Sequence, residues 1–221
     1  MLDLALTYAD LLLEGLGRTI AIAILGFALG FTISMLLSFM RFLAPWPVKS
    51  IAEAYIGFFR GTPLLVQIFM IFFGLPSIGI KMNAFTAATL AIGLNSGAYQ
   101  AEIVRSTVKG VPEEQLLVAR SLGLSEAQIL RHVVLPQAVR NAIPALTNEY
   151  VMLLKESALA SVIGVMELTR VGEFMTAATF RALEAYLLVA LVYLAVSYTF
   201  MKASKSTEKK LAIPGYERWV R

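Results

Sequence analysis

The sequence predicts an all-α integral membrane protein with five transmembrane helices, its N-terminus outside and its C-terminus inside. Of its 221 residues, 58% are hydrophobic and 15% are charged. The mean hydropathy of +0.72 is well above that of an ordinary soluble domain. Five apolar segments approach the roughly 20 residues that a bilayer-spanning helix needs. A polar stretch at 111–136 separates the third segment from the fourth.

The five predicted spans lie at 19–42, 51–75, 85–104, 144–163 and 185–201. The second is the least regular, because Arg60 and Gly61 interrupt its apolar run. Pro63 suits a first helical position and Thr62 suits the N-cap before it, so a new helix is expected to begin there. The segment 1–14 lacks the positive start of a cleaved signal peptide, and we expect it to lie along the outer interface.

The distribution of Lys and Arg predicts the orientation, because positively charged loops are retained in the cytoplasm. Most basic residues flank the spans on the side of the 111–136 stretch, together with the C-terminal segment. The opposite side holds only Arg18, Lys81, Arg170 and Arg181. The formal charge of +4 therefore does not indicate a nucleic-acid partner, since the basic residues do not form one stripe.

The stretch 111–136 predicts two short helices joined by a sharp turn. Glu113 suits the first turn of the first helix, and Gly123 suits its C-terminal end. Ser125 and Gln128 have the spacing of a capping box, which predicts the start of the second helix. Pro136 is expected to end it. By these local signals alone, an ordinary polar loop between two spans remains an alternative.

The residue content argues against catalysis and metal binding. The chain has no cysteine and a single histidine, His132, which excludes thiolate ligands and a two-histidine metal centre. The phosphate-binding pattern G-x-x-x-x-G-K-[ST] is missing, so ATP is not bound by that route. We expect no catalytic residue, metal site or cofactor in this chain, and any ATP-driven work requires a partner.

The 111–136 stretch resembles the cytoplasmic coupling motif of ABC importer permeases, which reads E-A-A, three residues, Gly, nine residues and I-x-L-P. Gly123 and Pro136 have the spacing of that motif. Leu117 and Val118 depart from it, since they stand where the family usually has Glu and Ala, and Ala119 matches. Four further stretches resemble the polar amino acid branch of the family: RGTPLLVQ at 60–67, GAYQAEIVR at 97–105, NEYVMLLKESALASVI at 148–163 and IPGY at 213–216.

This resemblance implies a multi-pass permease subunit in the plasma membrane, the cell inner membrane of a prokaryote. Its implied partners are membrane lipid, a second permease copy or homologue, cytoplasmic ATP-binding cassette subunits that bind ATP and Mg²⁺, and an extracytoplasmic substrate-binding protein. The implied contact with the ATPase is the 111–136 stretch. The docking residues implied there are Glu114, Leu117, Ala119, Arg120, Gly123 and Ser125.

Charged and polar residues inside the predicted spans indicate where substrate passes, because a charge at a helix centre costs about 2.5 to 3.5 kcal/mol on insertion scales. The fourth span carries Glu149, which we expect to contact an α-ammonium or a cationic side chain. In the third span Asn95 and Tyr99 lie one helical turn apart, and with Asn148 they are the expected hydrogen-bonding residues.

Glu102, Lys155 and Glu156 are expected to serve in gating or at an interface. A purely structural role in holding helices together is the alternative for all of these polar groups. At the level of function, the alternatives are a secondary transporter without ATP and a membrane scaffold. The first lacks the expected internal repeats, and the second leaves the charges of the fourth span unexplained.

Overall fold

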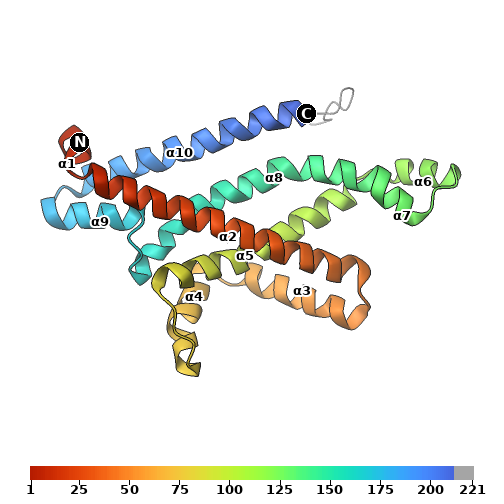
Figure 1. Cartoon of the computed structure of the whole chain (residues 1–221), viewed down its shortest axis with the longest axis horizontal. Helices are drawn as coiled ribbons and strands as arrows, with labels where there is room; N and C mark the ends of the chain where they lie inside the picture. Colours follow the sequence, from red (N-terminus) through yellow and green to blue (C-terminus); the bar gives the residue numbers. More distant parts are fainter. Residues whose placement is uncertain (212–221) are drawn as a thin grey trace.

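The computed structural model describes residues 1–211, and this part of the chain is helical with no strand (Figure 1). The IPGY stretch at 213–216 lies outside the described residues. The α-helices are α1 (Leu2–Thr7), α2 (Ala9–Leu43), α3 (Trp46–Gly61), α4 (Leu64–Phe69), α5 (Ala84–Lys109), α6 (Glu113–Ser121), α7 (Glu126–Ile129), α8 (Leu135–Glu156), α9 (Leu168–Thr179) and α10 (Ala182–Leu211).

Two of these helices, α2 and α10 over 182–203, are long and apolar enough to cross a membrane. A third candidate is the pair Trp46–Gly61 and Leu64–Ile78 if it is taken as one span. Helices α5 and α8 have 26 and 22 residues, which is also enough for a bilayer, but they carry more polar and charged side chains. Helices α1 and α9 lie at one end of the elongated molecule, and α6 and α7 lie at the other (Figure 1).

Helices α2 and α5 form the most extensive contact in the structure. Their glycines allow it: a Cβ on Gly30 would lie 2.8 Å from Gln100 Nε2, and one on Gly93 would lie 2.6 Å from Leu29 Cδ2. The pairs Gly26/Gly30 and Gly93/Gly97 each have the G-x-x-x-G spacing that lets membrane helices approach closely. The core beside this contact is built from buried side chains of α2, α4, α5 and α8, among them Ile22, Ile68, Ile92 and Leu153.

The predicted first span, 19–42, lies within a longer helix. The expectation that residues 1–14 lie along the outer interface stays a prediction. Helix α2 begins at Ala9, well before residue 19, so only α1 is separate from the first long helix. Asp10 in the first turn complements the helix dipole, and Glu14 pairs with Arg18 one turn later, so polar residues are accommodated in a helix that extends past its apolar part.

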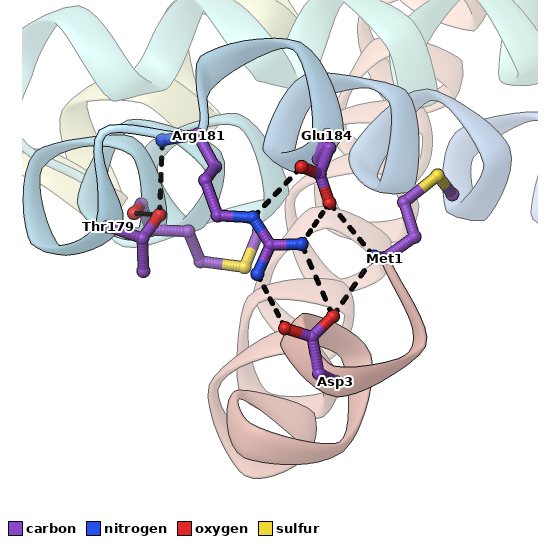
Figure 2. A network of polar contacts seen from close by, with 6 residues as sticks. Met1, Asp3, Thr179, Arg181 and Glu184 are labelled. Carbon is purple, nitrogen blue, oxygen red and sulfur yellow. Dashed lines mark hydrogen bonds and ion pairs between the residues drawn. The ribbon is translucent and has the colours of Figure 1, made fainter.

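An ion cluster ties α1 to the start of α10 (Figure 2). The Arg181 guanidinium lies between the carboxylates of Asp3 and Glu184, and its Nε donates to Glu184 Oε1 at 2.9 Å. The Met1 ammonium donates to both carboxylates, at 3.0 and 2.9 Å. The hydrogen bond from Arg181 holds the pKa of Asp3 well below its usual range. We call Asp3, Arg181 and Glu184 the α1–α10 clamp.

The predicted second span, 51–75, is broken. Helix α3 meets the helical segment Leu64–Ile78, which begins with α4, at an angle of 107°, and Thr62 and Pro63 form the break. The N-cap of α4 is Pro63, so the prediction that Thr62 caps it was wrong. The Thr62 hydroxyl instead donates to the Phe58 oxygen at 2.8 Å, within α3. Thr62 has the extended backbone that a residue before proline prefers, which ends α3 there.

The prediction that Pro136 ends a helix was also wrong. The start of the fourth span at Pro144 stays a prediction. Helix α8 begins at Leu135, contains Pro144 and ends at Glu156, followed by a 3₁₀ segment, Ser157–Ile163. A π-helical segment, Leu130–Val134, directly precedes Pro136. The wider turn accommodates a proline that has no N–H to donate, so the chain continues as a helix instead of stopping.

Candidate functional site

Glu149 on α8 takes part in hydrogen bonds that join α8 to α5 and α2. The Ser96 hydroxyl donates to Glu149 Oε1 at 2.7 Å, and Gln100 Nε2 donates to the Ser96 oxygen at 3.0 Å. The same Gln100 nitrogen donates to the backbone oxygen of Phe27 on α2 at 3.2 Å. Ser96 and Gln100 are fully buried, whereas Glu149 is half-buried. We call Glu149, Ser96 and Gln100 the α5–α8 network.

This network gives Glu149 a hydroxyl donor but no cation. Among the side chains that the structure describes, no Lys or Arg forms an ion pair with its carboxylate. A carboxylate held in poorly hydrated surroundings favours a proton or a positively charged ligand. Gln100 Oε1 is a second acceptor here, since it is buried and has no partner among the described residues. The arrangement can therefore accept hydrogen bonds from an ammonium or guanidinium group.

The side chain of Asn95, one residue before Ser96, points toward α3 and α4 and not toward Glu149. Its Nδ2 donates to the Phe59 oxygen at 2.9 Å and to Gln67 Oε1 at 3.0 Å. The Gln67 amide nitrogen donates in turn to Thr62 Oγ1 at 2.8 Å. Asn95 thus holds the break between α3 and α4, and the structure does not join it to Glu149. Its expected role in substrate binding stays a prediction.

Tyr99 and Asn148 are both on accessible surface. Tyr99 is 39% exposed, and the Arg60 guanidinium carbon lies 5.4 Å from its ring centroid, within the range of a cation–π contact. Asn148 is exposed next to Glu149 on α8, as is Lys155 farther along, whereas Glu156 is half-buried. The roles expected of these residues stay predictions.

Ser96 and Gln100 are the residues that the sequence did not identify. Their i, i+4 spacing in α5 was a usable signal, since such residues lie on one helix face. The polar stripe that was predicted, Asn95 and Tyr99, has the same spacing one residue earlier. A shift of one residue turns a helix face by about 100°, which is enough to point it at different neighbours.

Glu102, farther along α5, lies in a group of arginines. Its carboxylate accepts a hydrogen bond from Arg41 Nη1, accepts one from Arg105 Nη2 at 2.7 Å, and lies 3.6 Å from Arg60 Nη1. Arg41 is only 8% exposed and also donates to both Glu53 oxygens, at 2.8 and 3.0 Å. This Glu102 cluster ties together α2, α3 and α5. Its charges are already compensated by one another.

Two cavities lie away from Glu149. A groove of about 340 Å³ between α2, α8 and α10 is lined by mostly apolar side chains, including Phe27, Tyr150 and Phe200. A second, of about 710 Å³, lies near Arg18, Asn83 and the loop at 164–166. Glu149 lines neither.

The turn between α6 and α7 is built by glycine. Gly123 has φ +80°, and its N–H donates to the Arg120 oxygen at 2.9 Å, while the Leu124 N–H donates to the Ala119 oxygen at 3.2 Å. These two bonds form a Schellman motif. The next helix starts with the predicted capping box of Ser125 and Gln128. The predicted helix end and cap are confirmed, and the role of this turn in docking stays a prediction.

The six predicted docking residues do not share one surface. Glu114, Leu117 and Arg120 are exposed on α6, but Ala119 is 4% exposed and packs in a small core with Val111, Ile129 and Val134. Gly123 and Ser125 shape the backbone of the turn.

Apolar helices with polar groups gathered at their contacts, and a polar helical turn at one end, are typical of an integral membrane protein with functional polar groups inside the membrane. The family model described as "binding-protein-dependent transport system inner membrane component" matches residues 30–207. The chain belongs to this family, and it is therefore a permease of the inner membrane.

Curated relatives agree with this assignment over nearly the whole chain. The glutamine transport system permease protein GlnP of Escherichia coli (strain K12) is 38% identical over 205 residues, 92% of this chain and 94% of that protein. The arginine transport system permease protein ArtQ of Bacillus subtilis (strain 168) is 35% identical over 201 residues, 90% and 92% of the two chains. Both are permease proteins, so the role of this chain is transport and not catalysis.

Solved structures agree on the fold. A crystal structure of an amino acid ABC transporter with histidines is 38% identical, with a TM-score of 0.89 over 93% of this chain and 96% of that one. An inward-facing structure of the MetNI methionine ABC transporter is 21% identical, with a TM-score of 0.74 over 94% and 99%. The all-helical fold is that of ABC transporter permeases.

Proposed function

We propose that this chain is the permease subunit of an ATP-driven ABC importer for a polar amino acid delivered by an extracytoplasmic binding protein. The observation that carries the proposal is the match to amino acid permeases over more than nine tenths of the chain. The relatives are named for glutamine and arginine, and the related crystal structure contains histidines. These amino acids share an α-ammonium group and a polar side chain.

The α5–α8 network supplies the chemistry for such a substrate. Glu149 would bind the ammonium group or a cationic side chain, because no cation of the described chain neutralises it. Ser96 donates to one oxygen of the Glu149 carboxylate and Gln100 donates to Ser96, which leaves the other carboxylate oxygen for the ligand. Tyr99 and Asn148 would add hydrogen bonds at the exposed side of the site, and Asn95 would act from the α3–α4 break.

The membrane arrangement that fits this function has five spans, with the N-terminus outside and the C-terminus inside. Helices α2, α5, α8 and α10 would each cross the bilayer, and the bent pair α3 and α4 would form the fifth span. The α6–α7 turn would then lie in the cytoplasm. There it would dock ATP-binding cassette subunits, which bind ATP and Mg²⁺. A second permease copy or homologue would complete the substrate path, and lipid would cover the outer helices.

Reconstitution tests the proposal. The chain should co-purify with its ATP-binding cassette subunit, and the complex in proteoliposomes should hydrolyse ATP when the loaded binding protein is added. Radiolabelled amino acid should accumulate in the proteoliposomes only when ATP is supplied to the complex. Uptake without any ATPase would favour a secondary transporter, and assembly without uptake would favour a scaffold.

Gly123→Val tests the turn between α6 and α7. A β-branched residue at φ +80° costs at least the roughly 1 to 2 kcal/mol of an L-residue in the left-handed region, so the angle between the two helices should change. ATP turnover by the assembled complex should persist while uptake falls about tenfold. The exposed Gly57, which has no neighbour within 4 Å of an added Cβ, is the matched control as Gly57→Ala. Normal uptake by Gly123→Val would contradict a coupling role.

A further inference from the structure

The cavity of about 710 Å³ lies between α2, the start of α5 and the loop that precedes α9. Its lining is amphipathic, because charged side chains and apolar side chains meet there. The charged ones are Glu14 and Arg18, one helical turn apart on α2. The apolar residues of the lining are Ala21, Ala84, Phe85, Val165 and Met166. We call this the Arg18 cavity.

Arg18 lies at one edge of the apolar part of α2. No charged residue follows it in that helix until Arg41. At 1.5 Å per residue, the two arginines are about 34 Å apart along the helix, close to the roughly 30 Å of a bilayer's hydrocarbon core. The chain belongs to an inner membrane family, so phospholipid surrounds this helix. The Arg18 cavity therefore lies where phospholipid headgroups meet their acyl chains.

The charged pair in this cavity has hydrogen-bonding capacity to spare. Arg18 donates from Nη2 to Glu14 Oε1 and from Nη1 to the Met166 backbone oxygen at 3.4 Å. A guanidinium has five N–H donors, so others remain for an incoming anion. The side chains of Arg18 and Glu14 are 41% and 53% exposed, so both can be reached from outside the chain. The pair can thus accept one anionic group and one cationic group side by side.

We propose that the Arg18 cavity binds a zwitterionic phospholipid of the ethanolamine type, with its phosphate at Arg18, its ammonium at Glu14 and an acyl chain over the apolar residues. Guanidinium groups bind phosphate through charge-assisted hydrogen bonds. A phospholipid that has the phosphate but no ammonium meets Glu14 as a like charge and binds more weakly.

A free amino acid carries the same two charges, but it has no acyl chain to cover Phe85 and Met166. The apolar half of the lining therefore favours the lipid over a small zwitterion. The site itself requires only that the chain lies in a membrane. Its assignment to the outer leaflet rests on the proposed function, which sets the orientation.

The test titrates the full-length permease, purified in detergent and freed of bound lipid, with four probes. Dioleoyl phosphatidylethanolamine has the whole pattern, and dioleoyl phosphatidylglycerol lacks the ammonium. Dioleoylglycerol has the chains alone, and phosphoethanolamine has the headgroup alone. Thermal unfolding gives the apparent affinity, and native mass spectrometry counts the bound lipid. The ethanolamine lipid should bind about three- to fivefold more tightly than the glycerol lipid, the range of an exposed ion pair.

Arg18→Gln tests the phosphate contact. It should weaken binding of the ethanolamine lipid about tenfold, because a charge-assisted hydrogen bond is lost. Arg170→Gln is the matched control, since Arg170 is similarly exposed and also pairs with a glutamate of its own helix. This control should bind the lipid as the wild type does. An equal affinity of Arg18→Gln and Arg170→Gln would overturn the phosphate contact.

Glu14→Gln tests the ammonium contact. It should remove the preference for the ethanolamine lipid over the glycerol lipid, because the carboxylate that distinguishes them is gone. A preference that persists in this variant, or that is missing from the wild type, would overturn the zwitterionic headgroup.

Gly17→Leu tests the cavity by filling it. Gly17 lines the cavity, and an added Cβ there meets no atom within 4 Å, so the helix tolerates a larger side chain. The bound ethanolamine lipid should be lost. Gly57→Leu, at an exposed glycine of α3 with equally open surroundings, is the matched control and should retain it. Retention of the lipid by Gly17→Leu would overturn the site.

Two further outcomes would assign the cavity to another occupant. Stabilisation by phosphoethanolamine or free glutamine as large as that by the ethanolamine lipid would show a site for a small zwitterion. Loss of a permease dimer in Gly17→Leu, with lipid binding unchanged, would show a contact with a second copy. The proposed function is tested separately by uptake: a permease that imports its amino acid without any lipid preference overturns the lipid site alone.

Discussion

Glu149 and Glu102 are carboxylates at helix contacts, but only Glu102 is surrounded by positively charged side chains. Glu102 accepts hydrogen bonds from two arginines and lies near a third, so its charge is compensated within the chain. Glu149 receives a hydrogen bond from the Ser96 hydroxyl and forms no ion pair with the described residues. Glu102 is thus neutralised by its own chain, whereas Glu149 has no positively charged partner among the described side chains; a role of Glu149 in substrate binding stays a proposal.

The largest expected effect is on transport by Glu149→Gln. This change keeps the shape of the side chain and removes its charge, so a cationic group loses its partner. Uptake should fall at least about thirtyfold, at the low end of the cost of removing one member of a charge pair. Uptake of radiolabelled amino acid by proteoliposomes checks this, with co-purified ATPase measured in parallel. Unchanged uptake kinetics would show that Glu149 has only a structural role and that it does not differ in function from Glu102.

Glu102→Gln should show the opposite pattern. Arg41 is nearly buried, and the substitution removes one of its charged partners. The free energy of unfolding should therefore fall by about 1 to 3 kcal/mol. Uptake per assembled complex should stay within about threefold of the wild type. Thermal unfolding of the purified permease measures the first quantity. Glu173→Gln, which breaks an exposed pair with Arg170, is the control, and its effect should stay below about 1 kcal/mol.

Ser96→Ala sharpens the contrast, because it tests how Glu149 is held. Loss of the 2.7 Å hydrogen bond lets the carboxylate turn away, and uptake should fall about five- to tenfold. Ser106→Ala is the matched control, since Ser106 is exposed on the same helix and its hydroxyl donates to the Ile103 oxygen within that helix. If Ser96→Ala transports as well as Ser106→Ala, then Ser96 does not position Glu149.

The smallest effect concerns Asp3, a third carboxylate, which is exposed and paired with Arg181. Because the ion pair lowers the folded pKa of Asp3 below its ordinary value of 3.8, its stabilising contribution is complete above that value and is lost as pH falls through the lower one. Thermal stability should therefore fall with acid more for the wild type than for Asp3→Asn, in scans from about pH 5 to about pH 2. Asp10→Asn, at an exposed aspartate outside the α1–α10 clamp, should follow the wild type.

Local signals in the sequence predicted local structure well. Gly123 and Ser125 act through their own backbone and their near neighbours, so the helix end and the capping box could be predicted. Pro136 shows the limit of such signals, because the π-helical segment before it changes the hydrogen-bonding pattern and lets the helix continue. The rule that proline ends an α-helix applies to regular α-helical hydrogen bonding, and it does not apply after the wider π-helical turn.

The polar clusters join residues that are far apart in the sequence, and local sequence signals do not predict such contacts. Arg41 and Glu102 are separated by 61 positions, and Ser96 and Glu149 by 53. Asn95 and Ser96 are neighbours in sequence, but they bond to different helices, and only the packing of α5 decides which of them faces Glu149. The sequence therefore predicted the charged residue but not the residues that hold it.

The bend between α3 and α4 has a consequence for the order of biosynthesis. Asn95, which donates to both Phe59 and Gln67, lies 36 and 28 positions after them in the chain. The ribosome therefore releases the bend well before the side chain that secures it. The bonds from Gln67 to Phe59 and Thr62 can form as soon as α4 has been made, whereas the bonds from Asn95 to the bend must wait until α5 has been made.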